Sequence, residues 1–222
     1  IREERANDDD RQYRTLAADE VDHRGDDRFR EAGELDHLAE NGATTPYRQR
    51  PFVHPTHVRF LATPALDVGE ETSYGLEAAA IHGPFHAAAE THWLKADRLL
   101  DTAEDPTFFG GYAEIGYYLT GETRGYKNGQ LDRTKVKNPV GDGGFGAVQL
   151  NLRYDYLDLN DGTVIGGKQS AYAASLVWIP QDHVRFLLNY ARVDYDDAPV
   201  VAAGGDRDYA IDVFGARAQI DF

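Results

Sequence analysis

From about residue 45 onward, apolar and polar residues alternate with a period of two. The clearest run covers residues 145–159, in which one face is apolar and the other polar: Val148, Leu150, Leu152, Tyr154 and Tyr156 against Gln149, Asn151, Arg153 and Asp155. Such alternation indicates a strand with one apolar face. Similar runs predict eight strands in all, over residues 47–52, 72–81, 85–94, 109–120, 145–159, 171–178, 183–195 and 214–222.

The polar faces of these strands distinguish a barrel from a sandwich. They carry Arg, Asn, Gln, Asp and Tyr, and these residue types suit the surface of a water-filled lumen. The solvated face of a sandwich would favour Lys and Glu instead.

The last strand runs to the final residue, Phe222. An unpaired strand would fray there, so we expect this strand to pair with another strand. The fold class we predict is all-β, an antiparallel transmembrane β-barrel. The alternative is a soluble β-rich binding protein that ends on Phe by chance.

The connections between the strands fall into two classes. Gly83-Pro84 and 180–182 are short, whereas 95–106, 159–168 and 196–208 are longer and polar. Bacterial barrels have short periplasmic turns and long outer loops, and these lengths alternate correctly if Phe222 ends in the periplasm. One connection, residues 121–143, falls on the periplasmic side although it is long. Loops of this length are usually functional or disordered.

Charge and composition divide the chain into two parts. The net charge is −15, which argues against nucleic acid as a partner. The chain has no Cys, which excludes disulfides and cysteine metal sites. Residues 1–40 hold 14 Asp and Glu residues against 7 Arg residues. We therefore predict an acidic polar segment, a loop or extension, over residues 1–42 and barrel strands over residues 43–222.

The long connection is basic in this acidic chain. Five cations, with Asp132 as the one acid among them, lie close together: Arg124, Lys127, Arg133, Lys135 and Lys137. Lys and Arg donors replace part of the hydration shell of an anion, and basic residues select anions in pores. Two interpretations remain, an anion site folded into the pore and a solvated loop near anionic lipid. Inward residues of the wall would extend the positive field, and the candidate set is completed by Arg153, Arg185, Arg217 and Lys168.

No motif indicates an enzyme, a cofactor or a metal. Residues 141–146 fit a G-x-G-x-x-G spacing but precede a strand, so dinucleotide binding is rejected. Asp158, Asn160, Asp161 and Gly162 have the wrong spacing for a calcium loop and predict a turn instead. His82, His86 and His92 lack a fixed ligand geometry, and no catalytic arrangement stands out.

Several segments, in order along residues 45–222, together resemble the phosphate-selective porins of the O/P type. The match is carried by residues 48–51, 119–127, 150–162, 166–169, 184–186, 189–190 and 214–222. The resemblance implies a trimeric outer-membrane porin of about sixteen strands, of which this chain holds roughly half, the C-terminal part. The remaining wall is then expected from upstream sequence, and the alternative is that the strands curl into a much narrower barrel.

The resemblance also implies a function. It implies a constricted lumen that guides phosphate or polyphosphate past Arg and Lys residues, and a long periplasmic loop folded into the barrel at the position of residues 121–143. We therefore expect an anion channel of the bacterial outer membrane, a homotrimer in contact with outer-membrane lipid. The charge of −15 departs from a strongly anion-attracting pore. The alternative is a non-conducting barrel that serves as an anchor or accessory subunit.

Overall fold

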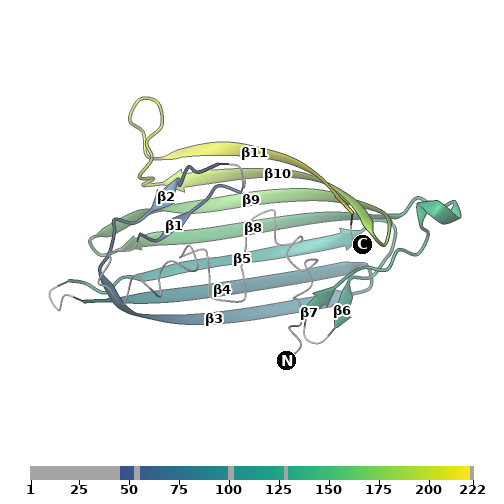
Figure 1. Ribbon diagram of the computed structural model, residues 1–222, viewed down its shortest axis with the longest axis horizontal. Coiled ribbons are helices and arrows are strands. Elements are labelled where there is room, and N and C mark those ends of the chain that lie inside the picture. Colours follow the sequence, from purple (N-terminus) through teal and green to yellow (C-terminus); the bar gives the residue numbers. More distant parts are fainter. Residues whose placement is uncertain (1–45, 53–55, 100–102, 128–129, 221–222) are drawn as a thin grey trace.

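One antiparallel sheet of seven strands dominates the described part of the chain. The computed structural model describes residues 46–52, 56–99, 103–127 and 130–220. The strand order is β11-β10-β9-β8-β5-β4-β3 (Figure 1). The strands are β3 (Val68–His82), β4 (Phe85–Arg98), β5 (Thr107–Tyr118), β8 (Ala147–Asp161), β9 (Val164–Gln181), β10 (Val184–Asp196) and β11 (Tyr209–Ile220). Within these described residues, no helix has the length and apolar character to cross a membrane.

Tight turns join three of the strand pairs. Residues 83–84 connect β3 to β4, residues 162–163 connect β8 to β9, and residues 182–183 connect β9 to β10. Gly83 and Gly162 have φ values of 55° and 53°, which the commonest hairpin turns of two residues use and which glycine adopts without strain. The connections 99–106, 162–163 and 197–208 lie at one end of the strands, which we call the Gly162 end. The connections 83–84, 119–146 and 182–183 lie at the opposite end of the strands, which we call the Pro84 end.

Two predictions about the connections and strands are corrected. Residues 159–168 are not a long loop, because β8 and β9 continue to a two-residue turn. Their polar residues remain within the sheet through cross-strand contacts such as the ion pair between Lys168 Nζ and Asp158 Oδ2 at 3.0 Å. Strand β11 begins at Tyr209, five residues before the predicted start, and its predicted end at Phe222 lies outside the described residues.

The predicted first strand, residues 47–52, does not join the sheet. Its two-residue strand β1 (Arg48–Gln49) pairs instead with β2 (Leu61–Ala62) in a separate ribbon. Tyr47 is fully buried, and its ring lies 5.0 Å from that of Phe108 on β5. The burial of Tyr47 and Leu61 against the sheet stabilises this segment on the face of the sheet, which explains why it does not form one of its strands.

The two faces of the sheet differ in the way the alternation predicts. On the outer face, apolar side chains are exposed: Ile115, Leu150, Leu152, Leu176, Leu188 and Phe214. Aromatic pairs also line this face, including Trp178 with Phe186 and Tyr154 with Tyr172. On the inner face, polar side chains such as Gln149, Arg153 and Asp155 are buried. At the Gly162 end, the inner face instead holds an apolar core with Leu157, Val193 and Tyr195.

The sheet is not closed. Strands β3 and β11 are its two edges in the described part of the chain, and a membrane-spanning sheet cannot leave such edges unpaired. The number of strands in the complete wall and the contribution of further strands stay predictions. The segment 1–42 lies outside the described residues, so the division at residue 42 stays a prediction.

Candidate functional site

The long basic connection folds back onto the inner face near the Pro84 end. The backbone N–H of Val136 donates to Oδ1 of Asp182 at 3.1 Å, and the hydroxyl of Thr134 is hydrogen-bonded to that of Tyr118. The Val136 side chain packs into a buried apolar cluster with Val177 and Leu187 of the sheet. These contacts hold residues 134–136 against the seven-stranded sheet, which we call the wall. We call residues 119–138 the inner segment.

A buried carboxylate joins the two ends of the inner segment. Glu122 is 1% exposed, and it accepts hydrogen bonds from the backbone N–H of Lys137 at 3.3 Å and from the hydroxyl of Thr120. The ammonium of Lys137 donates to the carbonyl of Gly121. Between these points, β6 (Gly125–Lys127) pairs with β7 (Gln130–Asp132) as a short hairpin. This arrangement fixes the position of Arg124, two residues after Glu122.

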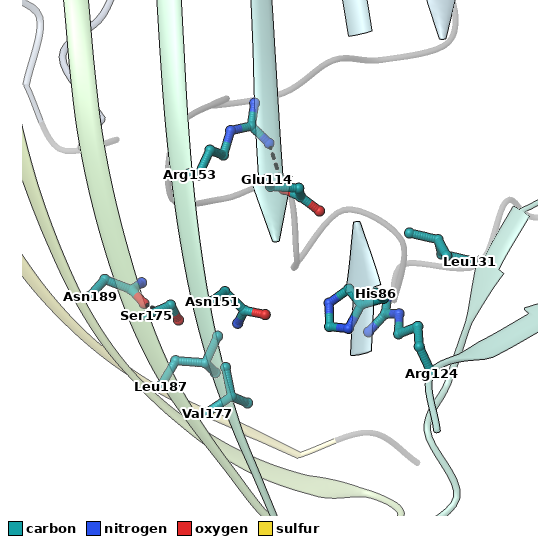
Figure 2. A pocket seen from close by; sticks show the side chains of 10 residues that line it. All are labelled: His86, Glu114, Arg124, Leu131, Asn151, Arg153, Ser175, Val177, Leu187 and Asn189. Atoms are coloured by element: carbon teal, nitrogen blue, oxygen red, sulfur yellow. Dashed lines mark hydrogen bonds and ion pairs between the residues drawn. The ribbon is translucent and has the colours of Figure 1, made fainter. Parts of the chain in front are cut away.

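Arg124 reaches a pocket between the inner segment and the wall (Figure 2). Its side chain lies beside the ring of His86 on β4, and both residues are buried. Strands β4, β5, β7, β8, β9 and β10 supply the lining together with Arg124, which directly precedes β6. The lining residues are His86, Glu114, Arg124, Leu131, Asn151, Arg153, Ser175, Val177, Leu187 and Asn189. The pocket therefore combines cations, a carboxylate and neutral amides.

A glycine in the middle of the wall brings two pocket side chains together. Gly116 on β5 is in register with His86 on β4 and with Asn151 on β8. Because Gly116 has no side chain, the side chains of His86 and Asn151 occupy the space above it. The amide of Gln149 bridges them, with Nε2 2.5 Å from Asn151 Oδ1 and 3.1 Å from His86 Nε2. This row forms a polar floor for the pocket.

Arg153 is enclosed by acidic and aromatic groups. Its guanidinium donates to both oxygens of Asp155, at 2.8 and 3.0 Å, and to Oε2 of Glu114 at 3.1 Å. It also lies 3.5 Å from the ring centre of Tyr112, whose hydroxyl donates to Glu90 at 2.7 Å. The Arg153 side chain is 2% exposed, so its charge is compensated where it lies.

The other predicted cations are spread over the molecule. Arg185 is buried on the inner face. Arg217 is exposed, and its pairing with the inner-face residue Leu187 places it on the inner face as well. Lys168 shares the outer-face row of Tyr172 on β9, where it pairs with Asp158. Four cations of the inner segment have exposed side chains: Lys127, Arg133, Lys135 and Lys137. Of the nine predicted residues, only Arg124 and Arg153 line the pocket.

Sequence reasoning missed several pocket residues. His86 was considered only as a metal candidate with His82 and His92, and the described residues contain no group of side chains suited to a metal ion. The useful signal was the alternation itself, which places His86, Glu114 and Asn151 on the polar faces of three strands that pair in sequence order.

Comparisons with known proteins agree with this architecture. The family described as phosphate-selective porin O and P matches residues 11–222. An uncharacterized protein of Caulobacter vibrioides is 57% identical over 180 residues, which cover 81% of this chain and 36% of that protein. Porin O of Pseudomonas aeruginosa is 32% identical over 174 residues, which cover 72% of this chain and 37% of that porin. The chain thus spans little more than a third of the length of these curated relatives.

Proposed function

We propose, because this chain belongs to the family of phosphate-selective porins O and P, that it builds part of the wall of a bacterial outer-membrane channel for small anions. Phosphate and polyphosphate are the proposed substrates. The sheet supports this proposal, since its exposed outer face is apolar and its inner face is polar, as a barrel wall around water requires. Family membership implies a channel and not an enzyme.

The observation that carries the proposal is the position of Arg124. A basic segment of an acidic chain folds onto the inner face, and one of its guanidinium groups lies in a polar pocket of the wall. Guanidinium donors replace water around a passing anion. In a narrow lumen, such a nearby cation outweighs the more distant acids of the surface, whose field salt screens over about 10 Å.

The proposed assembly is a homotrimer embedded in outer-membrane lipid. The apolar residues of the outer face suit lipid contact, as do the aromatic pairs near both ends of the sheet, Phe145 with Trp178 at the Pro84 end and Trp93 with Phe109 near the Gly162 end. Further strands outside this chain would have to pair with β3 and β11 to close each barrel.

The test is the reversal potential of the full-length protein in planar bilayers under a salt gradient. We expect anion selectivity in the wild type and a clear loss of it when five cations are replaced by Gln together: Arg124, Lys127, Arg133, Lys135 and Lys137. As a control, Arg192→Gln on the outer row of β10 should leave the reversal potential unchanged. A folded protein that never conducts would support the non-conducting alternative. Cation selectivity that the substitutions do not alter would leave only a general porin.

A further inference from the structure

The outer face of the sheet carries charged side chains at the Gly162 end. Six of them lie across β4, β8, β9, β10 and β11 and form what we call the outer belt: Lys95, Asp97, Asp158, Lys168, Arg192 and Asp212. On each of these strands, the belt lies on the Gly162 side of an aromatic residue of the same outer row. Lys95 follows Trp93 on β4, for example, and Arg192 follows Tyr190 on β10.

The outer rows at the Pro84 end differ from this belt. In the described strands, the last three outer positions before that end include no Asp, Glu, Lys or Arg. They hold apolar and aromatic side chains instead, among them Ile115, Leu150, Trp178, Phe186 and Ile220. The two ends of the outer face would therefore meet the headgroups of the two leaflets with different chemistry.

The cations of the belt are accessible from outside the sheet. The side chains of Lys95, Lys168 and Arg192 are 46%, 37% and 50% exposed. Lys168 Nζ lies 3.0 Å from Oδ2 of Asp158, and Arg192 Nη1 lies 3.6 Å from Oδ1 of Asp212. Exposed ion pairs of this kind contribute little to stability. A phosphate can therefore replace a carboxylate as the partner of such a cation at small cost.

We infer that the outer belt binds the phosphorylated headgroup of lipopolysaccharide, the glycolipid of the outer leaflet. Lys and Arg donate charge-assisted hydrogen bonds to phosphate, and the belt lies just beyond the apolar band of the wall, at the depth of lipid headgroups. Cations on β4, β9 and β10 suit a headgroup with several phosphates, and their restriction to one end suits a lipid of one leaflet.

This inference rests on the proposed function and on the expected orientation of the chain. Strand β11 runs from the Gly162 end to the Pro84 end, so a C-terminus in the periplasm leaves the Gly162 end on the outside of the cell. The belt would then lie in the leaflet that holds lipopolysaccharide.

The experiment titrates lipopolysaccharide, and phosphatidylglycerol in parallel, into the full-length folded protein in detergent and counts bound lipid by native mass spectrometry. Lys95→Gln/Lys168→Gln should weaken lipopolysaccharide binding by roughly tenfold or more, since each cation beside an anionic headgroup strengthens binding about fivefold. Asp158→Asn removes the ion-pair partner of Lys168 and should strengthen binding. The matched control, Lys127→Gln/Lys135→Gln, removes the same charge from exposed positions of the inner segment and should bind as the wild type does.

Equal binding by the wild type and Lys95→Gln/Lys168→Gln would overturn the inference, and so would an equal loss in the control. Asp158→Asn separates lipid binding from a structural role, because a belt that only stabilises the sheet would bind less lipid, and not more, when an ion pair is broken. Equal affinity of the wild type for phosphatidylglycerol would overturn the assignment to lipopolysaccharide. Failure of the proposed function would appear in the reversal potential, which this binding measurement does not use.

Discussion

Gly116 lies directly opposite His86 in the pairing of β5 with β4, and a Cβ atom at Gly116 would lie 2.1 Å from Cε1 of the His86 ring. Such an atom would also lie 2.4 Å from Oδ1 of Asn151 on the other neighbouring strand. The pocket floor therefore depends on the absence of a side chain at this position.

Gly116→Ala should disrupt this floor. The methyl group must displace the rings and amides above it, and overpacking of this kind costs about 1–3 kcal/mol. We expect a lower urea concentration at the midpoint of unfolding and a changed conductance. Gly141→Ala is the control, because a Cβ atom there meets nothing within 4 Å. Equal stability of the two variants would show that His86 and Asn151 move aside freely.

The alternation of residue types was sufficient to predict most of the sheet. Seven of the eight predicted strands coincide with β3, β4, β5, β8, β9, β10 and β11. The strand at residues 47–52 was wrong, because a short alternating run cannot show that Tyr47 packs on Phe108, a residue far along the chain. The connection between β8 and β9 was predicted as too long because Asp158 and Asn160 have loop-like polarity. Their partners Lys168 and Asp197 are visible only in the folded chain.

The candidate site was predictable in part. Charge contrast within the sequence located the basic segment, but it could not distinguish Arg124 from Lys135. That difference depends on Glu122 and on the β6–β7 pairing, which together turn one side chain to the wall and leave the other exposed. The compensation of Arg153 by Glu114 was likewise beyond the sequence, because it requires the register between β5 and β8.

Adjacent residues of β10 should respond in opposite ways to the same substitution. Leu188 is 60% exposed on the outer face, whereas Asn189 lines the inner pocket. Leu188→Arg should reduce the free energy of folding into lipid vesicles by about 2–4 kcal/mol, the cost of a lipid-facing Arg near the bilayer midplane. Asn189→Arg, which faces the lumen, should fold with little loss. Gln149 would be a poor control, because it is fully buried. Equal losses at residues 188 and 189 would argue against a membrane wall.

Asp182 should act as the fastening point of the inner segment. Its carboxylate accepts the N–H of Val136 from a turn that is 46 residues away in the sequence. Asp182→Ala removes a hydrogen bond worth about 0.5–1.5 kcal/mol. We expect faster hydrogen exchange at the amide of Val136 and greater noise in the open-channel current. Asp182→Asn keeps an acceptor oxygen and should exchange nearly as slowly as the wild type. Unchanged exchange in Asp182→Ala would assign the fastening to Thr134 and the Val136 side chain alone.

The five cations of the inner segment should contribute unequally to ion selectivity. Arg124 is buried in the pocket of the wall, whereas the side chain of Lys135 is exposed. A charge in a confined, weakly screened site acts more strongly on a passing ion than the same charge in open solvent. Arg124→Gln should therefore lower the anion-to-cation permeability ratio severalfold, and Lys135→Gln should change it little.

A second variant of the same residue, Arg124→Lys, keeps the charge but loses the planar set of donors. If charge alone matters, this variant behaves as the wild type, and if donor geometry matters it lies between the wild type and Arg124→Gln. Equal effects at residues 124 and 135 would mean that the segment acts through its total charge and not through the pocket.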